Sequence, residues 1–363
     1  MKTPPILTTE LERHMAGVIE RKGGWIGFDD FMALALYAPG LGYYANGLRK
    51  LGLMPASGSD FATAPEMTPL FGQALAAQVG QALQLSQTRE IWEFGAGSGA
   101  LALQLLQALG QAVERYTIVD LSASLRARQQ QTLHEFGDKV RWVDALPATM
   151  QGVVVGNEVL DAMPVKLLVR IQGQWHERGV VLHAAGIGWQ DRPTALRPPL
   201  EIPGPHDYLT EIHPQSEAFV LTLADRLVQG AVFFIDYGFP ESEYYHQQRH
   251  MGTVMCHRAH QSDPNPLVDL GLKDITAHVN FTSIALAGQE AGFHVLGYSN
   301  QARFLLNCGL LNLLESATLP DRVMGQKLII EHEMGELFKV IAFGKGPAWE
   351  PLGFVVGDRS HTL

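Results

Sequence analysis

Short apolar segments alternate with helical ones between residues 89 and 155, and this alternation is what most restricts the possible fold. Apolar runs of strand length lie at 89–94, 116–119, 140–143 and 153–155, with helical patterns at 100–109 and 122–136. Strands that alternate with helices form parallel sheets covered by helices. The sequence therefore predicts an α/β fold with a doubly wound parallel sheet.

Further elements flank this core. Helical spacing of apolar residues predicts helices over 10–20, 28–36, 65–85 and 215–228, and a strongly apolar strand over 231–236. Near the end, strand-like runs at 327–331 and 338–343 are joined by roughly six residues that include Gly335. This connection predicts a hairpin, so the last strand should run antiparallel to the one before it.

Composition excludes several classes of protein. The 363 residues contain 27 Lys and Arg against 37 Asp and Glu, a formal net charge of -10. This charge argues against nucleic-acid binding, which depends on clustered cations, and favours a basic partner. The chain has two cysteines, too few for a disulfide framework, and it has no apolar run near the ~20 residues that span a bilayer. Residues 1–10 resemble neither a signal nor a transit peptide, so we expect a cytoplasmic protein.

A glycine-rich turn follows the first strand of the alternating region. Gly95, Gly97 and Gly99 lie where this strand turns into a helix, and glycines there let a nucleotide approach the backbone closely. Asp120 closes the next strand, where a carboxylate accepts hydrogen bonds from ribose hydroxyls. The pattern predicts a nucleotide site.

This pattern alone does not decide which nucleotide binds. Gly95, Gly97 and Ala100 also satisfy the dinucleotide fingerprint, so an NAD-dependent oxidoreductase is an alternative. Glu93 opposes it, since an acid there holds a cationic amino group but repels a pyrophosphate. Asp144, after the third strand, is placed to accept from an adenine amino group, and the terminal hairpin is typical of methyltransferases. S-adenosyl-L-methionine is the favoured cofactor.

Several longer motifs carry a resemblance to a known family. They are the segments 59–66 (SDFATAPE), 157–165 (NEVLDAMPV), 235–238 (IDYG), 274–281 (DITAHVNF) and 334–340 (MGELFKV). Together they resemble the MidA-like methyltransferases, whose mitochondrial members are protein arginine methyltransferases that assist respiratory complex I assembly. Two positions depart from the family pattern: Ser59 replaces a common Gly, and Asn280 a common Asp.

The resemblance implies a class I, Rossmann-like methyltransferase with a seven-stranded sheet and an antiparallel last strand. It also implies a protein substrate, plausibly a respiratory complex I subunit, whose arginine is methylated. An assembly chaperone that binds the cofactor with little catalysis is a second hypothesis. Four segments are expected: a helical extension and lid (1–60), a cofactor-binding half (61–165), an inserted substrate region at the edge of the sheet (166–225) and the rest of the sheet (226–363).

Acidic and amide side chains after the fourth strand are the first candidates for catalysis. Asn157, Glu158 and Asp161 follow the carboxyl end of this strand, where open α/β sheets bind ligands. A carboxylate that pairs with a guanidinium fixes it for attack, so Glu158 is our first choice to hold the target. The alternative is that Glu158 caps the next helix and that Asp161 is a solvated or capping residue.

Other candidates depend more on the resemblance. Thr63, Pro65 and Glu66, with Asp60, form either a loop over the cofactor or a helix cap. His278 either orients or deprotonates the substrate, or it is a structural, hydrogen-bonded histidine. Tyr237, in the 235–238 motif, either bonds the target or packs.

A cluster of Cys256, His257 and His260, near His246 and His250, resembles metal ligands at first. The spacing fits no standard structural zinc pattern. We expect no metal and regard these histidines as loop residues at the mouth of the substrate site.

Overall fold

The predicted sheet is present in the computed structural model, which describes residues 7–46, 63–120 and 122–363. Within these residues seven strands follow the order β15-β16-β10-β5-β2-β3-β4. Neighbouring strands from β4 to β10 are parallel, and β16 is antiparallel to both β10 and β15. The strands are β2 (Glu90–Phe94), β3 (Arg115–Val119), β4 (Val140–Val143), β5 (Met150–Asn157), β10 (Leu227–Phe239), β15 (His294–Asn300) and β16 (Phe338–Lys345). The predicted fold class, with its antiparallel last strand, is confirmed.

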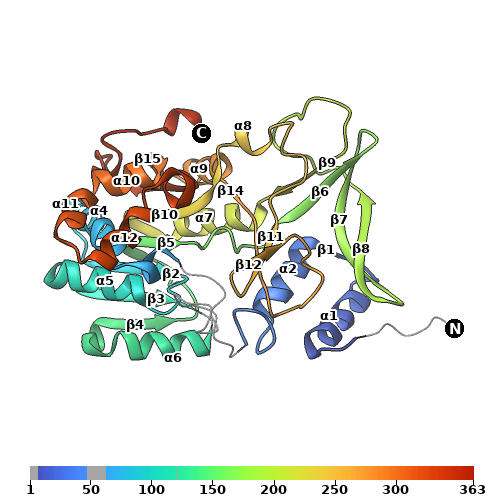
Figure 1. The fold of residues 1–363 in the computed structure, drawn as a ribbon, viewed down its shortest axis with the longest axis horizontal. Coiled ribbons are helices and arrows are strands. Elements are labelled where there is room, and N and C mark those ends of the chain that lie inside the picture. The colour runs from blue at the N-terminus through green and yellow to red at the C-terminus, as the bar shows by residue number, and fades with distance from the viewer. Residues whose placement is uncertain (1–6, 47–62, 121) are drawn as a thin grey trace. The chain divides into compact units, whose positions relative to one another are not determined.

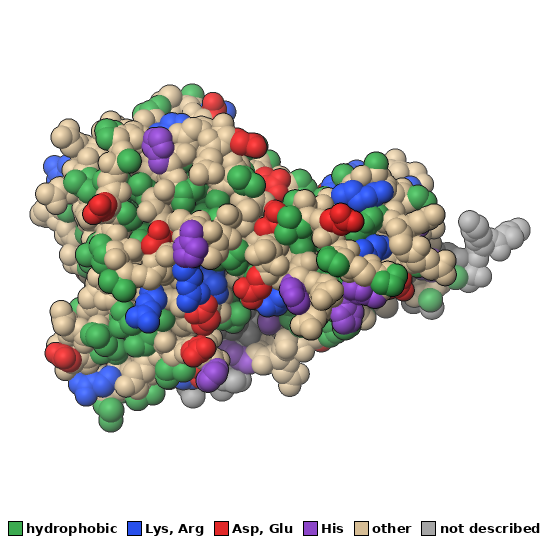
Figure 2. All heavy atoms as spheres, turned by 90° about the horizontal axis from the view of Figure 1, so that it is seen from above, with side chains coloured by type: hydrophobic (Ala, Val, Ile, Leu, Met, Phe, Trp, Pro, Cys, Tyr) green, Lys and Arg blue, Asp and Glu red, His purple; other side chains and the backbone are tan. Residues whose placement is uncertain are grey.

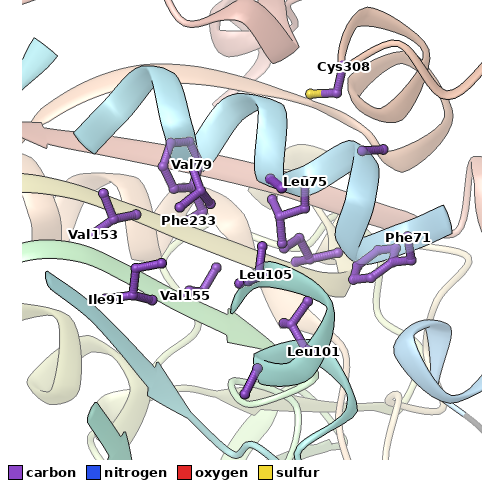
Figure 3. Close-up of a cluster of buried hydrophobic side chains, with 14 of the residues drawn as sticks. Phe71, Leu75, Val79, Ile91, Leu101, Leu105, Val153, Val155, Phe233 and Cys308 are labelled. Atoms are coloured by element: carbon purple, nitrogen blue, oxygen red, sulfur yellow. The ribbon is translucent and has the colours of Figure 1, made fainter. Parts of the chain in front are cut away.

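Helices on this part of the chain pack against the sheet, and two of them bury the face that carries Ile91. Ile91, Val153 and Phe233 on β2, β5 and β10 are fully buried. Figure 3 shows their side chains beside those of Val79 on α4 and Leu105 on α5. Each such side chain contributes about 1.5–3 kcal/mol when it leaves water. The helices are α3 (Ala64–Met67), α4 (Leu70–Leu85), α5 (Ala100–Leu109), α6 (Ala123–Thr132), α7 (Pro214–Arg226), α9 (Phe281–Glu290), α10 (Gln301–Asn307), α11 (Leu310–Ser316) and α12 (Leu319–Lys327).

Three predicted elements differ from the structure. The single helix over 65–85 is two helices, because Pro69 forces the preceding Thr68 into an extended conformation, with φ -160° and ψ 144°. The helix over 122–136 ends at Thr132 and continues as a 3₁₀ segment in which Gly137 has φ 51°. The strand over 327–331 is wrong, and so is the hairpin: Lys327 ends α12, and the antiparallel partner β15 is separated from β16 by α10, α11 and α12.

A second, antiparallel sheet contains most of the region expected as an insertion. Its order is β1-β7-β6-β9, with β8 on β7. The expectation that 166–225 adds to the edge of the main sheet is wrong, because β6 pairs with β7 and β9, and β8 pairs with β7. Gln172 and Gly173, with φ 50° and 81°, form the two-residue turn between β6 and β7. The strands are β1 (Ile26–Gly27), β6 (Lys166–Ile171), β7 (Gln174–His183), β8 (Gly186–Pro193) and β9 (Tyr208–Ile212).

The remaining elements are short, apart from two N-terminal helices. A capping box starts the first helix: Glu12 N donates to Thr9 Oγ1 (3.1 Å), and Thr9 N to Glu12 Oε2 (2.8 Å). Leu11, Met15 and Ile19 are buried, as their spacing predicts. These elements are α1 (Glu10–Arg21), α2 (Phe28–Tyr37), α8 (Glu241–Tyr244), β11 (Met255–Arg258), β12 (Gln261–Asp263), β13 (Asp274–Thr276) and β14 (Val279–Asn280).

The chain divides into two compact units, each built from three stretches. Unit 1 comprises 1–48, 161–216 and 241–280, and unit 2 comprises 49–160, 217–240 and 281–363 (Figure 1). The boundaries of these units differ from those of the four contiguous segments expected from the sequence. The division into those four segments remains a prediction.

The surface carries charges of both signs. On the face seen in Figure 2, Lys and Arg side chains are interspersed with Asp and Glu. Among the residues that the structure describes, no helix combines the length and the apolar character needed to cross a bilayer.

Candidate functional site

The glycine-rich turn of unit 2 has backbone conformations that favour glycine. Gly95, Gly97 and Gly99 have φ of 62°, 53° and 86°, and α5 begins at the next residue. A Cβ on Gly95 would lie 2.9 Å from Val159 Cγ2, closer than real contacts allow. The turn thus brings bare backbone to the N-terminus of α5, where N–H groups attract anionic ligand groups.

The segment 63–66 lies against this turn. The Ser98 hydroxyl donates to Glu66 Oε1. Buried Gln104 donates from Nε2 to Pro65 O (2.8 Å), and its Oε1 accepts from Gly72 N (3.0 Å). Thr63 occupies the N-cap position of α3, but its side chain makes no capping hydrogen bond. Asp60 and Ser59 lie outside the described residues.

Glu93 is a buried carboxyl group directly before the turn. Its Oε2 accepts from the Tyr116 hydroxyl (2.7 Å). Burial raises the pKa of Glu93 to about 8; the hydrogen bond from Tyr116 opposes this rise and the charge of Asp120 adds to it. At neutral pH this carboxyl group therefore holds a proton, which a neighbouring cation would displace.

Asp120 closes β3 and is anchored by two hydrogen bonds. Its Oδ1 accepts from Ser122 N (2.8 Å) and its Oδ2 from Gln129 Nε2 (2.7 Å). Burial raises the pKa of Asp120, while these hydrogen bonds and Arg126 act against the rise. The carboxylate is thus held in one orientation at the end of its strand.

Asp144, after β4, is paired with Arg126 of α6. The ion pair joins Arg126 Nη2 to Asp144 Oδ1, and the same nitrogen donates to Asp120 O (2.7 Å). The Asp144 side chain is 73% exposed, so it stays open to a ligand. It lines an open pocket of about 370 Å³ with Ala123, Arg126, Ala127 and Gln130. The adenine contact predicted for Asp144 stays a prediction.

Asn157 and Glu158 end β5 as expected. Asn157 Nδ2 donates to Glu158 Oε1 (3.0 Å), while Asn157 Oδ1 is buried and has no hydrogen-bond partner among the residues that the structure describes. Glu158 has φ 53°, and its N–H donates to Ile235 O (2.9 Å). The turn is fixed by Asp236, whose Oδ2 accepts from Val159 N (3.1 Å) and Leu160 N (2.9 Å).

The other two predicted catalytic residues, Asp161 and His278, belong to unit 1. Asp161 is buried and its carbonyl accepts from Ala277 N (2.9 Å). His278 N donates to Thr253 Oγ1 (3.0 Å), and His278 O lies 3.0 Å from His213 Nε2. These contacts anchor the backbone of the 274–281 motif, and the functional roles of both side chains stay predictions.

The cysteine and histidine cluster also lies in unit 1. Cys256 is buried in β11, and burial raises the pKa of its thiol to about 12. Burial lowers the pKa of His257. Over the described ranges, no three His, Cys, Asp or Glu side chains are grouped in a way that could hold a metal ion.

Sequence reasoning missed three residues that organise the site: Gln104, Arg126 and Gln129. Gln104 lies in a helix whose other positions are mostly apolar, which is a weak signal of a buried polar contact. Gln129 lies among three consecutive glutamines, and α6 has almost no apolar periodicity to mark its buried face. Only the contacts made in the fold distinguish it from its neighbours.

Comparisons with known proteins identify the family. The family described as "Putative S-adenosyl-L-methionine-dependent methyltransferase" matches residues 74–299. "Protein arginine methyltransferase NDUFAF7 homolog, mitochondrial" from Caenorhabditis elegans is 25% identical over 376 residues, which cover 91% of this chain and 84% of that protein. The Danio rerio protein "Protein arginine methyltransferase NDUFAF7, mitochondrial" is 26% identical, with 90% and 85% covered.

A solved structure is more similar. A Burkholderia thailandensis protein bound to S-adenosyl-homocysteine is 47% identical, with a TM-score of 0.93, and the match covers 99% of this chain and 100% of that one. A native structure from the same organism is 46% identical, with a TM-score of 0.88. These matches confirm the MidA-like resemblance and favour S-adenosyl-L-methionine over the NAD alternative.

The residues of unit 2 fit this cofactor. The glycine-rich turn leaves room for close approach at the start of α5, and Asp120 and Asp144 offer carboxylate oxygens at two strand ends. Glu93 is a buried acid whose raised pKa a cationic amino group would lower. When bound, S-adenosyl-L-methionine supplies a methyl group on a positively charged sulfur. Because the family match spans well over half of the chain, the chain belongs to this family and is an S-adenosyl-L-methionine-dependent methyltransferase.

Proposed function

We propose that the chain methylates an arginine of a protein, and that this protein is a subunit of a respiratory complex. The observation that carries the proposal is the pair formed by Asn157 and Glu158 at the carboxyl end of β5. Ligands of open α/β sheets bind at this end of the strands.

The backbone of Glu158 supports a role beyond helix capping. A non-glycine residue at φ 53° is strained, and such strain persists where the surroundings enforce it, most often at functional sites. Asp236 enforces it by binding the two N–H groups that follow Glu158. The carboxylate of Glu158 is thereby placed by the main chain.

The chemistry of the pair suits a guanidinium target. A carboxylate binds two guanidinium N–H groups at once and draws positive charge toward them, which leaves the third nitrogen richer in electrons. Asn157 Oδ1 is a buried acceptor to which the described part of the chain supplies no donor, and it is suited to one further N–H. Together Glu158 and Asn157 would hold the target and keep water away, and the Glu158 carboxylate would receive the proton that the methylated nitrogen loses.

The substrate class rests on the relatives. Two mitochondrial proteins similar to this chain are named protein arginine methyltransferases. The net charge of -10 favours a basic partner. These points support a protein arginine as the acceptor, and the family resemblance supports a complex I subunit as the protein that carries it.

The experiment is transfer of labelled methyl groups from S-adenosyl-L-methionine to respiratory-complex fractions from cells that lack the gene. Peptide mass spectrometry then identifies the modified residue. Glu158→Gln should retain S-adenosyl-homocysteine binding within about threefold and lose at least a hundredfold in transfer rate, since a neutral amide cannot pair with the guanidinium. Glu290→Gln, at an exposed glutamate, is the matched control.

Methylated arginine in a complex subunit supports the proposal. Label on lysine, on small molecules or on unrelated proteins contradicts the proposed acceptor. Full transfer by Glu158→Gln contradicts the proposed role of Glu158. The wild-type chain could instead bind the cofactor and transfer no methyl group, while cells still require the chain to assemble the complex. This result would support the chaperone hypothesis.

A further inference from the structure

We propose that Gln129 is a positioning residue for the cofactor, because it fixes the Asp120 carboxylate and the Gly97 carbonyl relative to each other. Gln129 belongs neither to the glycine-rich turn nor to a strand end. It acts through groups that hold the cofactor and does not itself need to touch the cofactor.

The geometry places Gln129 between three parts of the site. Its Nε2 donates to Asp120 Oδ2 (2.7 Å) and to Gly97 O (3.1 Å), while its Oε1 accepts from Trp142 Nε1 (2.9 Å). One side chain of α6 therefore connects the glycine-rich turn, the end of β3 and a residue of β4.

The chemistry of the partners fixes the orientation of the amide. An indole N–H can only donate, whereas a carboxylate and a carbonyl accept. The Gln129 oxygen must therefore face Trp142, and its NH₂ group must face Asp120 and Gly97. The reverse orientation would lose all three hydrogen bonds.

Burial shows that this position is not a solvated helix surface. Gln129 is 0% exposed and is the buried residue of α6. A buried amide is costly unless it is hydrogen-bonded, so a position needed only for packing would favour an apolar residue. The helix also lies close to the turn, since Thr132 Oγ1 donates to Ser98 O (2.8 Å).

Several charged groups face Asp120 from the elements around it. Arg126 of α6 lowers the pKa of Asp120, and Glu93 of β2 interacts with it electrostatically. Asp144, after β4, is neutralised by its ion pair with Arg126. Gln129 contributes a neutral donor directly to the carboxylate, which favours its charged form.

The test measures S-adenosyl-homocysteine binding by calorimetry in a double-mutant cycle. Gln129→Met keeps the size of the side chain but removes its hydrogen bonds, and we expect binding to weaken about tenfold or more. In an Asp120→Asn background the same substitution should weaken binding by about threefold or less, because its partner has already changed. An equal loss in both backgrounds would overturn the proposal.

A second variant keeps the proposal testable if Gln129→Met does not fold. Gln129→Glu retains the acceptor for Trp142 but places a carboxyl group against Asp120, and two such groups share a site only by sharing a proton. The ratio of its S-adenosyl-homocysteine affinity to that of wild type, measured at each pH, should rise at least fivefold as the pH falls from 8.5 to 6. A constant ratio across this range would contradict positioning through Asp120.

Two controls separate positioning from packing. Gln131→Met makes the same chemical change at an exposed position of the same helix, and its binding should stay within twofold of wild type. Trp142→Phe removes only the third hydrogen bond and should weaken binding less than Gln129→Met does. A loss with Trp142→Phe equal to that with Gln129→Met would refute the proposal, because it would show that packing of α6 on β4 is the cause.

Discussion

Glu93 should release a proton when the cofactor binds, and the size of this effect follows from its pKa. With a pKa of about 8, roughly nine tenths of the chains carry a proton on Glu93 at pH 7. A cationic amino group beside the carboxyl group favours its charged form, so binding should release close to one proton at pH 7. At pH 9.5 the carboxyl group is already ionised, and its contribution should fall to nearly zero.

Calorimetric titration with S-adenosyl-homocysteine measures this number directly. Titrations at pH 7 in buffers of different ionisation enthalpy give the protons released per ligand bound. Glu93→Gln has the same shape but no proton to lose, so its release should be near zero. Its affinity should fall by about 2 kcal/mol, roughly thirtyfold, because a charge-assisted hydrogen bond is lost.

Tyr116→Phe provides the matched control. It removes the hydroxyl group that favours the ionised carboxylate, so the pKa of Glu93 should rise further and proton release should persist to higher pH. Equal proton release by wild type and Glu93→Gln would refute the reasoning, because the proton would then come from elsewhere. Release of no proton by wild type would show that no cation binds at Glu93.

Four further outcomes are expected. The folded-state pKa of Glu93 lies above the ordinary 4.5, so Glu93 should make the free energy of unfolding fall as pH rises from about 4.5 to about 8. The thermal midpoint of Glu93→Gln should lack this fall. Parallel curves of thermal midpoint against pH for wild type and Glu93→Gln would contradict the prediction. Glu158→Gly should relieve the strain at φ 53° and raise stability by about 1 kcal/mol while abolishing transfer; a lower thermal midpoint would argue against strain. Asp236→Asn should lower kcat at least tenfold with the S-adenosyl-homocysteine Kd within threefold, whereas an equal loss in Kd would place Asp236 in cofactor binding instead. Gly95→Ala should cost about 1–3 kcal/mol of stability and weaken S-adenosyl-homocysteine binding. Gly110→Ala is the control, because Gly110 has a similar φ of 52° but open space around it, and this substitution should leave binding unchanged. Equal effects of the two substitutions on binding would contradict a role for the close approach of Gly95 to Val159.

The main sheet was predictable because its signals are local. Strands such as Val140–Val143 and the helix Ala100–Leu109 have the predicted bounds, since apolar runs and helical spacing do not depend on distant residues. The glycine-rich turn likewise lies between strand and helix as predicted. The apolar run at residues 327–331 was predicted as a strand but forms the end of a helix and a turn. The strand that pairs with β16 in its place is β15.

The parts that depend on distant contacts were not predictable. The second sheet joins Ile26 of β1 to Val180 of β7, and no spacing rule predicts a pair so far apart in sequence. The polar contacts of Gln129 and Asp236 likewise depend on which strands become neighbours. Sequence placed Asn157 and Glu158 at a strand end, but the turn that fixes Glu158 needed the adjacent β10.

The position of β16 bears on how this protein can fold during synthesis. This strand is made after both of its neighbours, β10 and β15, yet it lies between them and is buried along nearly its whole length. Until it leaves the ribosome, β10 presents an unpaired apolar edge, which invites association with other nascent chains. We expect the protein to complete its sheet only after β16 has left the ribosome, and to depend on chaperones that shield that edge until then.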